Sequence, residues 1–517
     1  MRSRPRARPH AGGLLPWAAT SLGVSLSFAG APNLCGSSGA WSAGADRAPP
    51  AVSAYLNSLG NARFDMRAAC AHWAGTFSKR HRSVANLPPT SEPVPPQFVL
   101  FPGTGLDQRR LADWLKRSGY VRGLETARHF VVASFSKHIS TERLRRLLEA
   151  PEIEYAEPDC DGPDFLTTST EPQLGEQEDR SCWLRAARTS FPNDPCMDDL
   201  WGHQKIGWDS SVAAHSLPRL VAVLDSGIDA AHEDLARNIQ LRLDPLEVPR
   251  SLGQRLNARC ATSGRCYPHG TEMAGTIGGR MDNGIGIVGV APNSHLLPVV
   301  IGRVESGLLS RLSTIAEGID SAVFNEADVI NISAKWPVDS RAISESIRAA
   351  VGENGGTRRL IVTGYATSLD FDDSVREYFP SQYRCLSGVL AAVPADMRGQ
   401  NLFKPTTRPN ANDGRIQAPG VDIVVTTNEN SERGYALSEA AGASSAAAYV
   451  SGVVALVWGS PPLDTCDAQQ IKRLLFCRSK TSNSTRYPWI HVEFLRELAN
   501  IDPDADCRAA MDALGCD

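Results

Sequence analysis

Residues Glu439–Trp458 read EAAGASSAAAYVSGVVALVW, and this stretch decides the fold that the rest of the chain builds around it. The run is long enough for a membrane span, but its serines and glycines and its scarcity of Leu and Ile leave it weakly apolar. Because small residues allow close approach on every side, the stretch predicts a helix buried at the centre of a large soluble domain. Gly442 and Ala443 form the turn into this helix, and Ser444 lies at its N-terminus.

A serine at the start of a buried helix has two interpretations. Unpaired backbone N–H groups and the positive end of the helix dipole favour an oxygen that acquires negative charge, as a nucleophile does. The alternative is an ordinary N-cap serine. The choice between them depends on the rest of the chain.

The composition excludes one class of partner and indicates a compartment. The 517 residues carry a formal net charge of -4 and no basic stripe, which excludes a nucleic-acid partner. Basic residues from Arg2 to Arg8, an apolar segment Leu14–Phe28 and the small residues Ala29–Ala31 follow the order of a signal peptide over residues 1–31. No later run predicts a membrane span, and twelve cysteines fit an oxidising environment. The sequence therefore predicts a secreted or periplasmic protein.

Before residue 160 the chain has a low-complexity part and then a compact unit. Residues 32–96 are rich in Ala, Ser, Pro and Gly, with enough apolar residues for a helix only at Val52–Phe77, and we assign them no function. Residues 97–159 alternate strand and helix patterns, which predicts a small α+β sandwich of the ferredoxin-like type. The predicted elements are strands Gln97–Phe101, His129–Phe135 and Ile153–Ala156 and helices Asp107–Arg117 and Thr141–Glu149. A polar linker over residues 160–190 follows.

From residue 191 to residue 517, short apolar runs alternate with amphipathic helices. This alternation predicts an α/β fold with a mostly parallel sheet and helices on both faces. The predicted strands are Leu220–Leu224, Leu296–Ile301, Val329–Ile332, Leu360–Thr363 and Val389–Val393, with crossover helices Leu308–Asn325 and Arg341–Val351. Ligands bind at the C-terminal ends of such strands, which singles out Asp225 directly after the first strand.

Three signals that are weak alone combine into a strong one. Asp225 lies in VAVLDSGID, His269 in PHGTEMAGT at the start of a second small-residue helix, and Ser444 in the stretch quoted above. Separately they are a strand that ends in a polar turn, a structural histidine and a serine cap. Nucleophilic hydrolysis needs a serine, an imidazole that takes its proton, a buried carboxylate that holds the imidazole, and donors for the oxyanion. The three residues, each with neighbouring glycines, are therefore predicted to be catalytic.

These motifs carry a family resemblance that covers most of the chain. From about Phe191 onward the sequence resembles the subtilisin-type serine proteases, in VAVLDSGIDAAHEDL, HGTEMAGTI, GIVGVAP, DVINIS and GASSAAAYVSGVVAL. The resemblance implies that Asp225 orients the imidazole, that His269 is general base and then general acid, and that Ser444 is the nucleophile. Residues 97–159 are similar to the family's propeptide, which implies an intramolecular chaperone and inhibitor.

The sequence departs from the family pattern at the end of the fourth predicted strand. The family has Gly-Asn there, and the asparagine amide completes the oxyanion hole, whereas this chain has Gly364-Tyr365. Tyr365 is the candidate replacement donor, because a phenol also donates a hydrogen bond. Glu272 stands where the family has a second histidine, and it either stabilises the imidazolium or faces solvent.

The resemblance also implies a substrate-binding segment. It assigns this role to Gly307, Ser333 and Ala334. In the family's S-L-G segment this chain has Ser333-Ala334-Lys335, so that a lysine stands in the cleft wall where a glycine gave room for substrate backbone.

The chemistry requires no cofactor, but the resemblance implies a possible structural calcium ion held by Asp234 and Asn283. A zinc site of Cys260, Cys266 and His269 is disfavoured by their spacing, and an oxidising compartment favours a disulfide between the two cysteines. The segment GIGIVG from residue 284 matches a dinucleotide fingerprint, but no apolar strand precedes it, and we reject that site.

The sequence thus predicts a serine endopeptidase that acts on proteins and peptides, is made as a zymogen and is inhibited by its own propeptide. The alternative is a weakly active or inactive subtilisin-fold binding or scaffold protein, because Tyr365 replaces the oxyanion asparagine. A fluorophosphonate probe, which labels only an activated serine, distinguishes the two.

Overall fold

The computed structural model divides the chain into two compact units, residues 1–42 and residues 43–517, and every described residue belongs to the second. The described residues are 50–60, 64–74, 95–160, 181–240, 268–304, 308–309, 311–336, 338–352, 359–365, 367–369, 375–400, 414–428, 434–438, 442–480, 487–502 and 504–516. Over these ranges, no helix has both the length and the apolar character that a bilayer crossing requires. The predicted signal peptide lies outside them.

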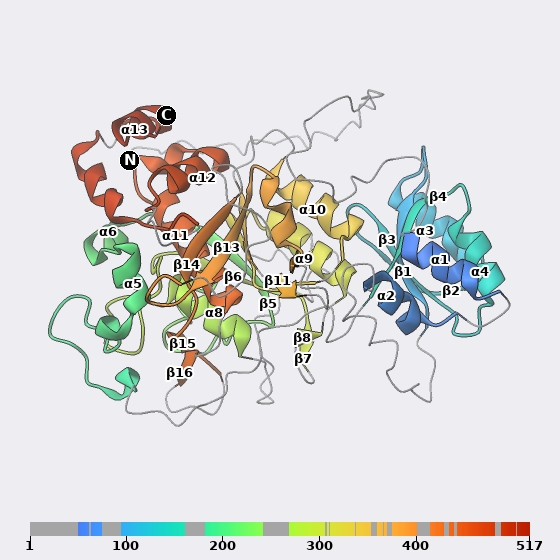
Figure 1. Cartoon of the computed structure of the whole chain (residues 1–517), viewed down its shortest axis with the longest axis horizontal. Coiled ribbons are helices and arrows are strands. Elements are labelled where there is room, and N and C mark those ends of the chain that lie inside the picture. The colour runs from blue at the N-terminus through green and yellow to red at the C-terminus, as the bar shows by residue number, and fades with distance from the viewer. Residues whose placement is uncertain are drawn as a thin grey trace, which may run out of the picture. The chain divides into compact units, whose positions relative to one another are not determined.

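Residues 95–160 form an antiparallel sheet in the order β2-β3-β1-β4 with two helices packed on it (Figure 1). Its elements are β1 (Gln97–Pro102), α3 (Gln108–Arg117), β2 (Val121–Thr126), β3 (Val131–Phe135), α4 (Thr141–Leu148) and β4 (Ile153–Pro158). The side chains of Asp107 and Ser140 accept hydrogen bonds from the first turns of α3 and α4, as N-caps do. The predicted strands and helices are present. The sequence pattern missed β2, because this edge strand is largely exposed and its two apolar residues, Val121 and Leu124, do not alternate.

Two short helices precede this sheet and share its apolar core. They are α1 (Pro50–Ser58) and α2 (Met66–Ala74), and the rings of Phe64 and Phe98 lie 5.7 Å apart. The disulfide Cys70–Cys160 joins α2 to the residue after Asp159. The sequence predicted at most one helix in this part of the chain. Gly60, with its positive φ, marks the turn that divides it.

The larger part of the molecule is built on a six-stranded parallel sheet in the order β14-β13-β10-β9-β5-β6. The strands are β5 (Leu220–Asp225), β6 (His295–Val300), β9 (Val329–Ile332), β10 (Leu360–Gly364), β13 (Val389–Ala395) and β14 (Arg415–Pro419). Five were predicted within a residue or two. The predicted α/β fold with a mostly parallel sheet is confirmed.

Helices cover both faces of this sheet, as Figure 1 shows. Ala222 and Leu224 of β5 belong to the core shared with α9 (Leu312–Phe324) and α10 (Arg341–Val351). Val221 and Val223, which point the other way, belong to the core shared with α8 (His269–Gly278) and α11 (Ala443–Trp458). Helix α11 is buried along almost its whole length, as its small residues predicted.

Peripheral elements complete the fold. The helices are α5 (Trp201–Ile206), α6 (Ser210–His215), α12 (Ala468–Cys477), α13 (Cys507–Ala513), η2 (Cys182–Leu184), η3 (Met197–Asp199), η4 (Ser381–Cys385), η6 (Leu463–Thr465) and η7 (Glu493–Asn500). The short strand pairs are β7 (Arg303–Val304) with β8 (Leu308–Leu309), β11 (Thr367–Leu369) with β12 (Val375–Glu377), and β15 (Ile423–Thr426) with β16 (Tyr435–Ser438). Further disulfides join Cys182–Cys196, Cys466–Cys507 and Cys477–Cys516.

Two buried carboxylates at the end of β4 contact the N-termini of α9 and α10. Glu157 accepts hydrogen bonds from Ser340 Oγ (2.8 Å) and from the backbone N of Arg341 (2.9 Å) and Ala342 (3.2 Å). Asp159 accepts from the backbone N and Oγ of Ser313 at 3.0 and 2.8 Å. Helix N-termini present unpaired N–H groups and positive potential. These contacts therefore hold the sheet of residues 95–160 against the larger sheet.

Candidate active site

Asp225 ends β5 and is almost fully buried. Each of its carboxylate oxygens lies 2.9 Å from Nδ1 of His269. The backbone N of Ser226 donates to Asp225 Oδ1 at 2.7 Å, which fixes the carboxylate plane. A carboxylate in this position makes Nδ1 the protonated nitrogen of a neutral imidazole and directs Nε2 away from Asp225.

His269 is the first residue of α8 and is also buried. Burial lowers the pKa of His269, but the charge of Asp225 and its hydrogen bond outweigh that effect, so the pKa is raised above 6.5. Glu272, one turn along α8, raises this pKa further through its charge, which fits the first of its two predicted roles. The imidazolium is therefore stabilised, as a general base requires.

A glycine and a serine bring α8 against β5. A Cβ on Gly270 would lie 2.2 Å from the carbonyl O of Gly227, so only glycine allows this approach. The backbone N of Gly270 donates to Ser226 Oγ at 3.0 Å. The sequence assigned Ser226 only to the polar turn after the strand, and its place directly after the buried aspartate was the available signal for this contact.

Ser444 is the second residue of α11 and is 8% exposed. Its Oγ donates to the carbonyl O of Ser333 at 3.2 Å. Ser333 Oγ in turn donates to Asn331 Oδ1 at 3.0 Å, and Asn331 Nδ2 donates to Ser451 Oγ of α11 at 3.0 Å. This chain of hydrogen bonds ties the start of α11 to the end of β9. Sequence reasoning missed Asn331, and a lone amide in the apolar run VINI was the signal for it.

The end of β10 lies directly against the start of α11. A Cβ on Gly364 would lie 2.8 Å from the carbonyl O of Ala443, and glycine is therefore required there. The next residue, 365, is where the sequence predicted a donor for the oxyanion.

The Tyr365 phenol does not lie in that place. Tyr365 is fully buried with Ala391 and Val393, on the face of β13 away from α11. Its hydroxyl accepts a hydrogen bond from Arg415 Nη1 at 3.3 Å, and the same nitrogen donates to Tyr487 OH at 3.1 Å. This geometry corrects the expectation that Tyr365 replaces the oxyanion asparagine, because its side chain pairs with a buried guanidinium on the other side of the sheet.

The predicted substrate-binding residues are only partly described. Ser333 and Ala334 follow β9 and are buried, and Ser333 contacts Ser444 as described above. Lys335 Nζ lies 5.3 Å from the ring centroid of Tyr378, and burial lowers the pKa of Lys335. Gly307 lies outside the described residues.

The predicted calcium ligands Asp234 and Asn283 contact each other, with Asn283 Nδ2 2.7 Å from Asp234 Oδ1. Asp234 Oδ2 accepts from Tyr435 OH at 2.8 Å and from the backbone N of Ile287 at 3.0 Å. Asn283 Oδ1 accepts from the backbone N of Ile285 at 3.1 Å. Calcium takes six to eight oxygen ligands. Because protein donors already use these oxygens, the arrangement does not fit a calcium ion, and we derive no role for a metal.

The proposed sulfur ligands of the rejected zinc site, Cys260 and Cys266, lie outside the described residues. Within the described ranges, no group of three or more His, Cys, Asp or Glu side chains is arranged to hold a metal.

The structure has a parallel sheet, a buried aspartate–histidine pair at one strand end, and a serine at the start of a central helix. This combination is typical of a class of hydrolase, the serine hydrolases. The comparison with known proteins places the chain more narrowly. The subtilase family model (peptidase S8) matches residues 219–487, more than half of the chain. The chain belongs to this family of serine endopeptidases.

Relatives match about half of the chain. Subtilisin from Bacillus pumilus is 31% identical over 256 residues, which are 49% of this chain and 81% of that protein. Subtilisin E from Bacillus subtilis is 30% identical over 269 residues, 52% of this chain and 62% of that protein.

Two solved structures share the fold. Fervidolysin from Fervidobacterium pennivorans, a keratinolytic enzyme related to subtilisin, superposes with a TM-score of 0.58 and 21% identity, covering 81% of this chain and 63% of that one. The epidermin leader peptide processing serine protease from Staphylococcus aureus gives 0.54 and 16%, covering 79% and 99%.

Proposed function

We propose that the chain hydrolyses peptide bonds of protein substrates through Asp225, His269 and Ser444. The observation that carries this proposal is the buried pair in which both oxygens of Asp225 lie 2.9 Å from His269 Nδ1. With Nδ1 protonated, Nε2 accepts the proton of Ser444 as Oγ attacks the substrate carbonyl, and it then returns that proton to the leaving amine. Water hydrolyses the acyl-enzyme by the same steps.

At residue 365 the chain lacks one of the two hydrogen-bond donors that stabilise the oxyanion in this family. The backbone N–H of Ser444 lies at the start of α11, where the helix dipole favours the developing negative charge. The second donor of the family is an asparagine side chain, and residue 365 does not supply one. Losing one such donor costs about 10²–10³ in kcat, a magnitude measured in subtilisin itself. We therefore expect slow turnover with substrate binding largely intact.

A fluorophosphonate probe tests the proposal, because it reacts only with an activated serine. Wild-type protein is expected to be labelled, and Ser444→Ala and His269→Ala are expected to lose labelling. Ser445→Ala is the matched control, since it removes the neighbouring hydroxyl of α11. Labelling that disappears in Ser445→Ala but persists in Ser444→Ala would refute the assignment. If wild-type protein neither reacts nor cleaves peptides, the binding or scaffold protein is the correct reading.

We also propose that the protein is a secreted zymogen. The N-terminal order of basic, apolar and small residues supports secretion. The contacts of Glu157 and Asp159 with α10 and α9 support a propeptide that stays docked as an inhibitor. The test is cleavage within the linker, residues 162–190, in a protease-free host. Wild-type protein should be cut there and Ser444→Ala protein should not, and equal cutting of both would show that processing is not autocatalytic.

A further inference from the structure

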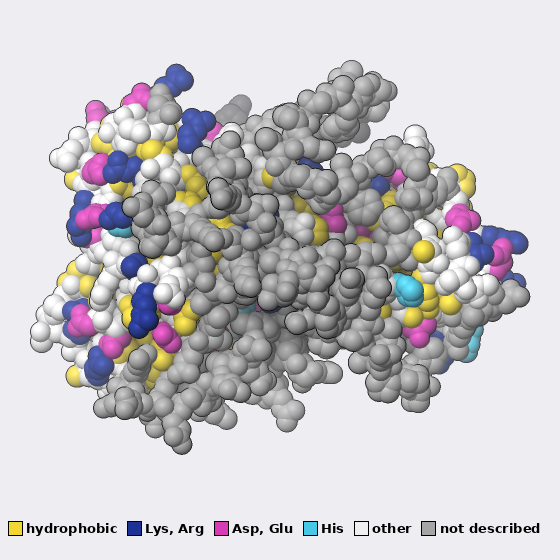
Figure 2. Space-filling view, viewed as in Figure 1, with side chains coloured by type: hydrophobic (Ala, Val, Ile, Leu, Met, Phe, Trp, Pro, Cys, Tyr) yellow, Lys and Arg dark blue, Asp and Glu magenta, His cyan; other side chains and the backbone are white. Residues whose placement is uncertain are grey.

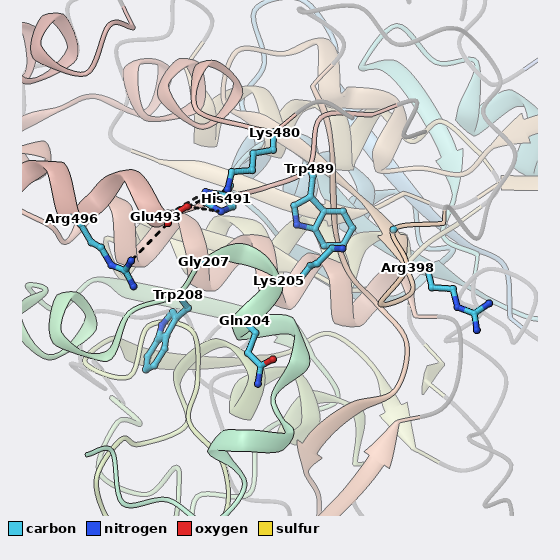
Figure 3. A pocket seen from close by; sticks show the side chains of 11 residues that line it. Gln204, Lys205, Gly207, Trp208, Arg398, Lys480, Trp489, His491, Glu493 and Arg496 are labelled. Atoms are coloured by element: carbon cyan, nitrogen blue, oxygen red, sulfur yellow. Dashed lines mark hydrogen bonds and ion pairs between the residues drawn. The ribbon is translucent and has the colours of Figure 1, made fainter. Parts of the chain in front are cut away.

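A cavity lies away from the catalytic residues, between α5, the chain that leads into η7 and the turn after β13 (Figure 3). Its volume is about 630 Å³, and its lining includes none of Asp225, His269 and Ser444. We call it the cationic pocket, and the side chains that define it are Lys205, Arg398, Lys480, Trp489, His491 and Arg496.

Backbone hydrogen bonds and one close contact hold the walls of the cationic pocket. Lys480 and Trp489 exchange backbone hydrogen bonds of 2.9 Å in both directions, and Ile490 N donates to Gln417 O of β14 at 2.9 Å. On the opposite wall, a Cβ on Gly207 would lie 2.7 Å from His491 Nε2, so the end of α5 and this histidine are in direct contact. The backbone around Trp489 and His491 is therefore fixed, and the exposed side chains of Lys205 and Arg398 lie beside it.

The charge of the pocket is unbalanced. Four cations line it, against the single lining carboxylate of Glu493, although Arg496 also pairs with Asp209 at 2.6 Å beside the pocket. The Glu493 carboxylate already has partners, at 3.2 Å from Lys480 Nζ, 3.5 Å from His491 Nε2 and 3.8 Å from Arg496 Nη1. Figure 3 shows these pairs gathered on one side of the pocket.

The other side of the pocket has two cations and an aromatic ring. Lys205 Nζ lies 5.5 Å from the centroid of Trp489, and Arg398 lies beyond the same tryptophan (Figure 3). In the part of the chain that the structure describes, neither Lys205 nor Arg398 forms an ion pair. The chain as a whole carries a net charge of -4, and Figure 2 shows basic and acidic side chains interspersed over the described part of the visible face. The positive charge of this pocket therefore contrasts with the negative net charge of the chain.

We propose that the cationic pocket binds an acidic segment of a polypeptide, with carboxylates on Lys205 and Arg398 and apolar atoms on the face of Trp489. Charged hydrogen bonds to cations in a partly enclosed site are stronger than those on an open surface. The choice of a polypeptide as ligand rests on the proposed function: a second contact on the same substrate raises its effective concentration at the catalytic serine. Substrates with an acidic stretch away from the scissile bond would then be preferred.

The test is calorimetric binding of a tetraglutamate peptide to full-length Ser444→Ala protein at low salt, with tetraglutamine as the uncharged comparison. Binding of the first peptide only is expected, and it weakens at high salt because exposed charges are screened. The double variant Lys205→Gln/Arg398→Gln should bind at least about tenfold more weakly.

The matched control is Lys116→Gln/Arg146→Gln. It also removes one lysine and one arginine charge, here from the exposed faces of α3 and α4, and it should leave the affinity for tetraglutamate unchanged. Equal weakening by both double variants would show that only overall charge matters, and no binding of tetraglutamate would overturn the proposal. Binding of pyrophosphate without tetraglutamate would assign the pocket to phosphate groups instead. Fluorophosphonate labelling of wild-type protein reports on the catalytic residues separately, so failure of one proposal does not hide the other.

Discussion

Removing the hydroxyl of Tyr365 should lower stability without slowing catalysis. In Tyr365→Phe the ring still packs with Ala391 and Val393, and it still faces the Arg415 guanidinium, whose carbon lies 5.4 Å from the ring centroid. What is lost is a hydroxyl acceptor for a guanidinium whose residue is 1% exposed. Loss of one buried acceptor costs about 1–3 kcal/mol. We expect a decrease of that size in the free energy of unfolding and a kcat within about twofold of wild type.

Denaturant unfolding and steady-state peptide hydrolysis, at equal folded concentration, measure the two quantities. Tyr487→Phe is the matched control, because it removes the other hydroxyl bonded to the same Arg415 nitrogen. The two variants should resemble each other in both assays. A collapse of kcat in Tyr365→Phe alone would mean that the phenol donates to the oxyanion, and the reasoning from its buried position would fail.

The remaining predictions concern charge, pH and metal. Asp225→Asn should reduce kcat by about 10⁴-fold. Because the Asp225 charge raises the pKa of His269, the pH–rate profile of the residual activity should also move to lower pH. An unchanged profile would contradict this prediction. Burial raises the pKa of Glu157 from 4.5 to about 7 and outweighs the hydrogen bonds from Ser340, Arg341 and Ala342, which lower it. The docked state therefore favours the protonated form, and stability falls as pH rises from about 4.5 to about 7. Glu157→Gln, in Ser444→Ala protein, should remove up to about 3 kcal/mol of this dependence in unfolding measurements between pH 5 and 8, and parallel curves would exclude Glu157 as the cause. EDTA should leave the melting temperature unchanged, because protein donors already bind Asp234, whereas a fall that calcium reverses would restore the calcium site.

The local sequence was sufficient for much of the fold. Short apolar runs bounded by turn residues and separated by amphipathic helices are typical of strands in a parallel sheet, which is why β5, β9 and β10 were predicted closely. The many small residues of α11 allow close packing on all sides, which is why its burial was predicted. The position of Asp225 also followed from sequence, since a polar residue directly after such a strand lies at the edge where ligands bind.

The direction in which individual side chains point depended on tertiary packing. Tyr365 lies at the sequence position of an oxyanion donor, but the burial of Arg415 two strands away creates a partner on the opposite face of the sheet. The short strand β2 lacks alternating apolar residues, and its pairing with β3 supplies its hydrogen bonds.

The cationic pocket also depends on tertiary structure and could not be predicted from local sequence. Lys205, Arg398, Lys480 and Arg496 are ordinary surface residues in sequence, separated by up to 291 positions. Chain folding brings them around one cavity, because α5, the turn after β13 and the chain before η7 all meet beside the edge strand β14. Local patterns set which segments become strands and helices, whereas charge that accumulates between distant segments depends on how those segments pack.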